Sequence, residues 1–376
     1  GSCGTCGVDD GVDFMEDVCR EICREEGITV KVAKIYSELS RETVNEKLGS
    51  GKIKPLEPVM ELDQEKVNKC SHIVGVLGAE PFIEALKNGA DIVLAGRTTD
   101  TAVLACMPLL KGCSPAAAWH GAKVCECSGT CTTSPQSGGI VLTVDESGFE
   151  VESPARDSIC TPFTISAHLL YENADPFYLV EPGVIVDVSE ADYIQLPEGR
   201  VRVENTRIWQ TSYTMKLEGA GPAGYQTITL VGIRNRIVLK DPMSWLDKLS
   251  AHADQKLGSL GYDPDSYSYS LRPYGYQAVY GGDVPEGYIP NELGVLLTVT
   301  ADDQETATKI AKVFNPILLH FEVAKNTPKP SFAFPFSPAE VEKGRIYEFQ
   351  LNHVIELDDP FELIRMEYVT IDGKEE

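Results

Sequence analysis

The chain has 376 residues, of which 57 are acidic and 33 basic, so its formal net charge at pH 7 is −24. With 43% hydrophobic and 24% charged residues, it has the composition of a folded globular protein large enough for two or three domains. The acidic balance argues against non-specific binding to nucleic acid or anionic membranes, because both need a basic surface. We therefore expect a small anionic substrate to be held locally, by arginine, lysine or backbone N–H groups.

Neither a membrane span nor a secretory leader is indicated. No apolar stretch approaches the roughly 18 residues of a membrane-spanning helix, and no charged-then-apolar leader opens the chain. The 11 cysteines are an odd number, which fits a reducing compartment better than a disulfide framework. We therefore expect a cytoplasmic protein.

Up to about residue 110, helical and strand patterns alternate. The first predicted helix has an apolar face made of Val12, Met15, Cys19 and Ile22. Gly27 ends this helix, Ser40 caps the next, and Pro81 stands in the first turn of a later one. The predicted strands are 28–35, 71–78 and 91–96, and the further helices are 40–48, 79–90 and 97–110. This alternation predicts a parallel sheet covered by helices on both faces.

From about residue 140 the pattern changes to runs of strands. Alternating apolar and polar residues predict half-buried antiparallel strands at 139–144, 149–153, 200–205, 212–219, 225–233, 266–275, 293–301 and 345–357. Helices are expected at 244–257 and 303–321. We therefore predict an α/β ligand-binding domain over residues 1–140, followed by an α+β domain with antiparallel strands over residues 141–376.

The opening stretch GSCGTCGVDDG has glycines spaced as in a ligand-cradling turn, directly before the first predicted helix. Backbone N–H groups of such a turn, with the helix N-terminus, form a ready anion site. The spacing is neither that of a dinucleotide-binding loop nor that of a P-loop. A bound anion and a plain tight turn are equally compatible with it.

The stretch AGRTTDTA, residues 95–102, follows a predicted strand. Open α/β sheets bind ligands at the carboxyl ends of their strands. Arg97 offers a two-pronged contact to a carboxylate or phosphate. Asp100 is a candidate general base or metal ligand, but local sequence favours its being the N-cap of the next helix.

Cysteines cluster in VCECSGTC at Cys125, Cys127 and Cys131, and folding could add Cys3 and Cys6. Thiolates at short spacing suit an iron-sulfur cluster or a divalent metal such as zinc. The spacing matches no established zinc or ferredoxin motif, and free cysteines are common in protein cores. His120 and His168 lie in apolar helical stretches, where a structural role is commoner than a catalytic one.

Several motifs resemble the acyclic terpene utilisation family named after AtuA. The resemblance begins at GAEPFIEALKNGADIVLAGRTTDTAVLA and continues through AWHGAKVCECSG and TPFTISAHLLYENADPFYLVEPG. It extends over YTMKLEGA, Tyr274 with Gly275, residues 318–320, and FAFPFSPAEVEKGRIYEFQLNHVIELDDP. The matched motifs cover nearly the whole chain in the family's order.

The resemblance implies that a glycine-rich turn like the opening one normally lies well inside the polypeptide, after an N-terminal α/β segment. We therefore expect that the parallel sheet is incomplete here and that a separate polypeptide completes it, because open sheet edges must be covered. A small companion protein is a second candidate partner, and we expect an oligomer. By resemblance, the site residues are Gly1, Ser2, Gly4, Thr5, Glu80, Arg97, Asp100, Thr101, His168, Glu172 and Asn173.

The leading hypothesis is a lyase, a hydro-lyase acting on a small hydroxylated carboxylate. Arg97 and the turn would bind the carboxylate, and Asp100, Glu80 or His168 would move the proton. A metal held by the cysteines would act as a Lewis acid on the leaving hydroxyl. The alternatives are an enzyme of branched-chain or terpenoid acyl-CoA catabolism and a noncatalytic subunit of a heteromeric enzyme.

Overall fold

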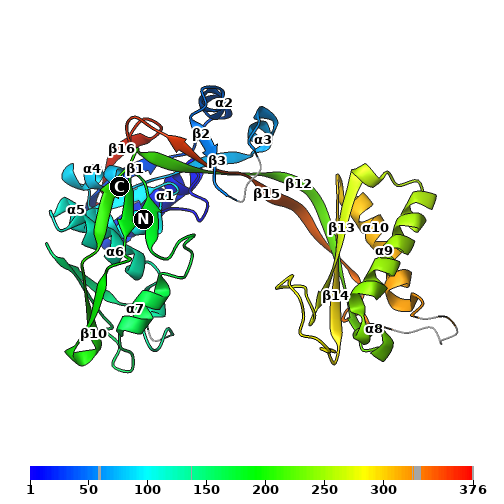
Figure 1. Ribbon diagram of the computed structural model, residues 1–376. Coiled ribbons are helices and arrows are strands. Elements are labelled where there is room, and N and C mark those ends of the chain that lie inside the picture. The colour runs from blue at the N-terminus through cyan, green and yellow to red at the C-terminus, as the bar shows by residue number, and fades with distance from the viewer. Residues whose placement is uncertain (58–60, 137, 324, 326–331, 375–376) are drawn as a thin grey trace. The chain divides into compact units, whose positions relative to one another are not determined.

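The computed structural model describes residues 1–57, 61–136, 138–323, 325 and 332–374 (Figure 1). These residues form two compact units. The first consists of Gly1–Ala220 together with Phe349–Glu376, and the second is Gly221–Glu348. The predicted domain boundary at residue 140 therefore differs from this division, in which the C-terminal strands return to the first unit.

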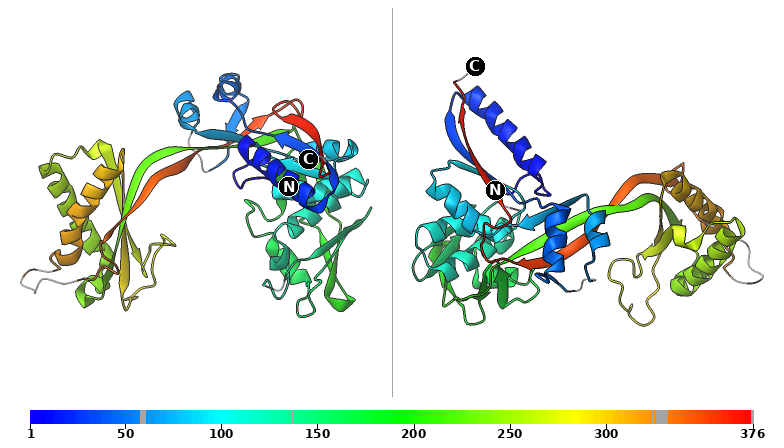
Figure 2. Two further views of the ribbon diagram at one scale, coloured as in Figure 1. Left: turned by 180° about the vertical axis from the view of Figure 1, so that it is seen from behind. Right: turned by 90° about the horizontal axis from the view of Figure 1, so that it is seen from above.

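The first unit contains a mixed three-stranded sheet. Strand β1 (Thr29–Tyr36) lies between β4 (Ile92–Ala95), which is parallel to it, and β16 (Arg365–Asp372), which is antiparallel. Helix α1 (Asp9–Glu26) packs along β1 and β16, as the view from above in Figure 2 shows. Gly27 ends α1 in the left-handed conformation with a φ of 64°, as predicted.

The fold is a mixed α/β one, but within the described residues the purely parallel sheet expected at the N-terminus is not found. Strand β3 (His72–Val76) pairs antiparallel with β12 (Thr214–Ile233), and β16 adds an antiparallel edge to β1. Both partners come from distant parts of the chain, so local strand–helix alternation could not indicate them. Ser40 caps α2 (Arg41–Gly49) by accepting a hydrogen bond from the Thr43 N–H, as predicted.

The carboxyl ends of β3 and β4 nevertheless lie side by side. Leu77 and Thr98, which follow these two strands, form a parallel bridge. Ser2 forms a parallel bridge with Ala95 of β4. The opening residues therefore lie along the edge of β4 in strand-like fashion before the glycine-rich turn leads into α1.

The remainder of the first unit consists of short helices and strands. The helical ones are α3 (Gln64–Lys69), α4 (Glu80–Lys87), α5 (Asp100–Leu110), α6 (Pro115–Cys125), η1 (Ser128–Cys131), α7 (Pro162–His168) and η2 (Pro197–Gly199). One small sheet has the order β5 (Val141–Val144), β6 (Gly148–Glu152), β10 (Arg200–Glu204) and β9 (Asp192–Leu196). The other has the order β11 (Arg207–Gln210), β8 (Val184–Asp187) and β7 (Tyr178–Glu181). All their pairings are antiparallel, as the sequence predicted beyond residue 140.

In the second unit, β13 (Tyr267–Tyr274), β14 (Leu293–Ala301) and part of β12 form an antiparallel sheet, together with part of β15 (Glu340–Glu356). Buried residues alternate along β14, and Val295, Leu297 and Val299 join the core with the helices. These helices are α8 (Arg236–Lys240), α9 (Pro242–Ser259) and α10 (Gln304–His320); a short turn of helix, η3 (Pro264–Ser266), precedes β13. Strand β15 continues into the first unit, where it pairs with β2 (Ile53–Pro55).

Candidate functional site

The candidate site lies in the first unit, where β3 and β4 end and α5 begins. The Leu77 N–H donates to the Arg97 carbonyl at 2.9 Å, and the Thr99 N–H donates to the Leu77 carbonyl at 3.1 Å. Thr99 then caps α5, because its hydroxyl oxygen accepts a 3.1 Å hydrogen bond from the Ala102 N–H. The interpretation of Asp100 as the cap is therefore wrong, and the Asp100 carboxylate is available for another role.

Glu181 is the buried carboxyl group of this site. It is the last residue of β7, and its Oε1 accepts a 2.6 Å hydrogen bond from the Thr101 hydroxyl. Its Oε2 is buried without a hydrogen-bond partner among the described residues. Burial raises the pKa of Glu181 to about 7. Near neutral pH this carboxyl group can therefore both accept and donate a proton, as general acid–base catalysis requires.

A buried ion pair lies near Glu181. Lys123, in the last turn of α6, pairs with Glu126, and their side chains are only 9% and 6% exposed. Both charges act on Glu181: the Lys123 ammonium lowers its pKa and the Glu126 carboxylate raises it, both less strongly than burial does. Burial raises the pKa of Glu126 itself, and the ion pair opposes this.

His168 is the last residue of α7 and lies beside the Lys123–Glu126 ion pair. It is 6% exposed, and its Nδ1 lies 3.3 Å from the Thr130 hydroxyl oxygen. Its Nε2 is buried without a hydrogen-bond partner among the described residues. Burial lowers the pKa of His168 and the positive charge of Lys123 lowers it further, while contact of the ring with the Lys123 backbone carbonyl raises it in part. The imidazole is therefore held neutral, which suits a metal ligand or a proton acceptor.

Two more of the predicted residues, Asp100 and Glu172, interact electrostatically with Glu126 and Cys127. The negative charges of Asp100 and Glu172 both raise the pKa of Glu126 and that of the Cys127 thiol, in each case less strongly than burial does. We call this set the Glu181 cluster; it consists of Asp100, Thr101, Lys123, Glu126, Cys127, His168, Glu172 and Glu181. Asn173 has a different task, because its amide donates a 2.8 Å hydrogen bond to the Leu169 carbonyl and closes the end of α7.

Arg97 lies between the opening turn and β12. Its Nε donates to Glu218 at 3.1 Å, and Lys216 donates to the other oxygen of the same carboxylate at 2.8 Å. Two cations therefore share one carboxylate, which leaves a local excess of positive charge. Burial opposes ionisation of Glu218, but Lys216 and Arg97 lower its pKa below the usual value. In so acidic a chain, this is a suitable place for an anionic group.

Glu80 lies after the end of the neighbouring strand, β3, at the start of α4. The Tyr213 hydroxyl donates a 3.1 Å hydrogen bond to Glu80 Oε2, and burial raises the pKa of Glu80. A side chain at Gly78 would come within 2.7 Å of both groups and within 3.0 Å of Pro182. Glu80 therefore lies close to the residue that follows Glu181.

The residues of the opening turn make mainly structural hydrogen bonds. The Gly1 amino group donates to the Val93 carbonyl at 2.7 Å, and the Ser2 hydroxyl donates to the Gly96 carbonyl at 3.0 Å. Gly4 and Thr5 have left-handed backbones, with φ of 65° and 61°. The first N–H of α1, that of Asp9, donates to the Glu38 carboxylate at 3.0 Å. A carboxylate of the protein itself thus already binds the helix start, where the sequence left a bound anion and a plain tight turn equally compatible.

The five predicted metal-binding cysteines do not come together. Cys3 is buried in the core between α1 and the mixed sheet, Cys6 is exposed, and the Cys131 thiol donates to the Val124 carbonyl at 2.9 Å. Cys125 lines an apolar cavity with Leu104 and Met107. Within the described part of the chain, only Cys127 of the five belongs to a group of side chains that could ligate a metal, and its neighbours there are Glu126 and His168. Short sequence spacing grouped these thiols, but in the fold they lie in different environments.

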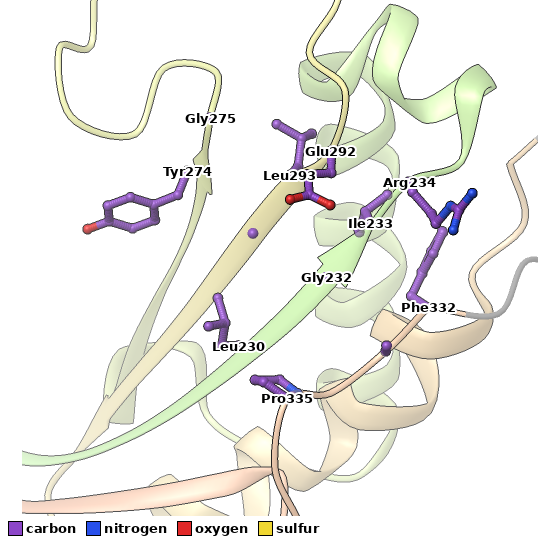
Figure 3. A pocket seen from close by; sticks show the side chains of 12 residues that line it. Leu230, Gly232, Ile233, Arg234, Tyr274, Gly275, Glu292, Leu293, Phe332 and Pro335 are labelled. Carbon is purple, nitrogen blue, oxygen red and sulfur yellow. The ribbon is translucent and has the colours of Figure 1, made fainter.

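The second unit holds a separate cavity of about 690 Å³ (Figure 3). Ile233 of β12 pairs with Leu293 of β14, so the neighbouring Arg234 and Glu292 lie at the same end of the sheet. The remaining lining is mostly apolar and includes Leu230 and Phe332. This cavity could hold an amphipathic ligand, but both of its charged residues are exposed. The buried acid–base groups are in the first unit.

Three members of the Glu181 cluster were not predicted as site residues: Lys123, Glu126 and Glu181. A usable signal existed for Glu181, because an acid that directly precedes Pro182 and Gly183 stands where a strand would end in a turn. Lys123 and Glu126 lie next to Cys125 and Cys127 in the sequence, and there only the cysteines were interpreted as site residues.

None of the described helices has the length and apolar character needed to cross a lipid bilayer. A family model described as "Acyclic terpene utilisation family protein AtuA" matches residues 11–324. Comparison with curated proteins gives no significant match, and neither does comparison with solved structures.

Proposed function

The chain belongs to the acyclic terpene utilisation family AtuA, and we propose that it is a catabolic lyase, a hydro-lyase that removes water from a small hydroxylated carboxylate. The geometry that carries this proposal is that of Glu181, whose Oε1 accepts from the Thr101 hydroxyl while Oε2 is buried without a hydrogen-bond partner among the described residues; burial raises its pKa to about 7. A base of this kind is what abstraction of a proton next to a carboxylate requires.

The proposed reaction assigns Glu181 as the base. Its carboxylate takes the proton from the carbon next to the substrate carboxylate, and the electrons of that C–H bond form the new C=C bond. The C–O bond on the neighbouring carbon breaks, and the hydroxyl group leaves as water after it receives a proton. Lys123, whose charge acts on both Glu181 and His168, is the proposed proton donor. Asp100 and Glu172 add negative charge near Glu126, the ion-pair partner of Lys123.

The substrate carboxylate is assigned to Arg97, with Lys216 as a second cation. Arg97 and Thr101 flank Thr99, the cap of α5, so one short turn carries both the anion-binding group and the group that orients the base. The Gly4 to Gly7 turn packs against the backbone of Arg97, because a Cβ at Gly7 would overlap the Arg97 backbone nitrogen.

The test is proton exchange in D₂O, followed by ¹H NMR, with a panel of free 2-hydroxy and 3-hydroxy carboxylates. The wild-type chain is expected to exchange the proton next to the carboxylate and to form the unsaturated acid. Glu181→Gln should abolish both signals. Glu150→Gln serves as the matched control, because Glu150 pairs with Arg200 in another sheet of the same unit. Equal exchange by wild type and Glu181→Gln would contradict the proposal.

The rival functions predict other results. Thermal stabilisation by CoA thioesters but not by the free hydroxy acids would favour acyl-CoA chemistry. Turnover that survives both Arg97→Ala and Asp100→Ala in an assembled complex would favour a noncatalytic role. The partner polypeptide expected from the family resemblance stays a prediction, and a stable, well-folded monomer in size-exclusion chromatography would contradict it.

A further inference from the structure

We propose that Glu126, Cys127 and His168 form a zinc site with an open fourth coordination position. One carboxylate oxygen, the Cys127 Sγ and one imidazole nitrogen all lie within 4.8 Å of one another. This set differs from the ligands that the sequence suggested, and it shares only Cys127 with them. The inference goes beyond the proposed function, because it concerns metal binding and does not depend on turnover.

Local structure brings the three side chains together. Glu126 is the C-cap of α6 and Cys127 is the N-cap of the following helical turn, η1, so the two residues lie at the junction of these elements. Helix α7 packs against η1 and presents His168 at its end. Donors from two separate elements thus converge on one point, and both elements are held by the surrounding core.

The unpartnered nitrogen of His168 is the second observation. His168 is 94% buried, and a buried polar atom without a hydrogen bond destabilises the folded protein. Thr130 lies at hydrogen-bond distance from Nδ1, so it can accept the Nδ1–H and leave the Nε2 lone pair free. A neighbour that fixes the tautomer in this way is typical of metal-bound histidines. A metal at Nε2 would satisfy the orphaned atom.

The charges around the group also favour a cation. Glu126 feels the negative charges of Asp100 and Glu172 and the positive charge of Lys123, and Glu181 feels the charges of Glu126 and Lys123. Lys123 contacts one oxygen of Glu126, Oε1, which leaves Oε2 for a metal. The positive charge of Lys123 is the unfavourable feature for a cation here, and the acids outnumber it.

Zinc is the metal that this donor set fits best. A thiolate, an imidazole and a carboxylate are all regular zinc ligands, whereas calcium and magnesium prefer oxygen alone. Three protein ligands with an open position are the pattern of catalytic rather than structural zinc sites. Zinc at this place would be available to polarise a substrate hydroxyl from a position beside the Glu181 cluster.

The experiment uses the full chain, stripped of metal with a chelator and dialysed. Zn²⁺ is titrated against a competing chelator, and Co²⁺ is added separately as a spectroscopic probe. We expect one Zn²⁺ per chain, and with Co²⁺ a thiolate charge-transfer band together with the strong visible bands of four-coordinate cobalt. Cys127→Ser should abolish the charge-transfer band. Cys125→Ser is the matched control and should retain it, because Cys125 lines the apolar cavity instead.

A further variant tests the site without changing a ligand. Thr130→Val removes only the group that orients His168, and we expect it to weaken Zn²⁺ affinity about 10- to 100-fold. Circular dichroism establishes that each variant is folded. The proposal is overturned if the folded wild-type chain binds no stoichiometric Zn²⁺, or if folded Cys127→Ser retains the thiolate band. Neither outcome bears on the role of Glu181, which the exchange assay measures separately.

Discussion

The Thr101 hydroxyl donates a 2.6 Å hydrogen bond to Glu181, although the two residues are 80 positions apart in the chain. Thr101 lies in the first turn of α5, directly after the end of β4, and Glu181 ends β7 in another sheet. This contact joins the strand-end loop that carries Arg97 to the buried carboxyl group. It is therefore the link between the anion-binding and the proton-transferring parts of the candidate site.

Replacing Glu181 by Gln should stabilise the protein, and more so at higher pH. The pKa of Glu181 is raised from 4.5 to about 7 in the folded state. The stability contributed by the protonated form is fully present below the unfolded pKa and is lost as pH rises through the folded pKa. The loss at about pH 8 is on the order of 3 kcal/mol. Urea unfolding at about pH 5 and about pH 8 measures the difference, and a pH-independent gain would refute the assignment.

Substitution of Thr99 should mainly lower stability, whereas substitution of Asp100 should mainly lower activity. Thr99→Ala removes the cap of α5 and should lower the free energy of unfolding by about 1 kcal/mol. Asp100→Ala should change stability much less, because Asp100 is not the cap, but it should reduce turnover through the Glu181 cluster. Denaturant unfolding of both variants, combined with the exchange assay, checks this. The reverse ranking of the two stabilities would restore Asp100 as the cap.

Gly7→Ala should be far more destabilising than Gly27→Ala. Both glycines have left-handed backbones, with φ of 71° and 64°, so the conformational strain is similar. A Cβ at Gly7 would overlap the backbone nitrogen of Arg97, whereas a Cβ at Gly27 meets nothing within 4 Å. We expect a loss of about 2–5 kcal/mol at Gly7 and about 1 kcal/mol at Gly27. Equal losses in thermal or denaturant unfolding would show that the turn does not press on Arg97.

Arg97→Ala should weaken binding of a carboxylate ligand about 10- to 100-fold, because a charge-assisted hydrogen bond is lost. Glu218 keeps Lys216 as a partner in this variant, so the protein should remain folded. Arg97→Lys should recover part of the affinity. Isothermal titration calorimetry with a carboxylate from the exchange assay provides the measurement. Arg200→Ala, which removes a partner of Glu150, should leave binding unchanged.

Lys34 holds α1 against the mixed sheet and should be important for stability. Its Nζ lies 2.6 Å from Glu16 Oε2, and the two side chains are 12% and 11% exposed. Lys34→Ala leaves Glu16 nearly buried with Arg20 as its remaining ion-pair partner, so we expect a loss of about 2 kcal/mol. Lys309→Ala, in an exposed helical pair with Glu305, should leave the unfolding free energy nearly unchanged. Similar effects of the two changes would mean that the Lys34 pair is effectively solvated.

Sequence reasoning located the local elements of the site well. The strand ending in Ala95, the turn with Arg97, and the helix that begins beside Asp100 follow one another within a few residues, and local pattern determines such units. The cap was misassigned by one residue, because Thr99 and Asp100 are both good capping residues. Similarly, the buried face of α1 includes Cys23, while the predicted Ile22 is 49% exposed.

Long-range pairing was beyond such reasoning. The two predicted strands 212–219 and 225–233 are one continuous strand, β12, which pairs with β3 in one unit and with β14 in the other. Strand β16 was not predicted, and it pairs with β1 from the other end of the chain. The pairing partners of a strand depend on global topology and not on its own pattern of residues.

The sequence by itself determined the family, the acidic character of the chain, and the strand-to-helix turn that carries Arg97, Asp100 and Thr101. Only the tertiary structure decided which groups meet that turn. Glu181 and His168 come from elements distant in the chain, and burial among those elements changes their pKa values. Tertiary packing also separated the cysteines that sequence spacing had grouped and left Cys127 beside a glutamate and a histidine. The physical reason is that side-chain direction and desolvation arise from packing, which short-range spacing does not encode.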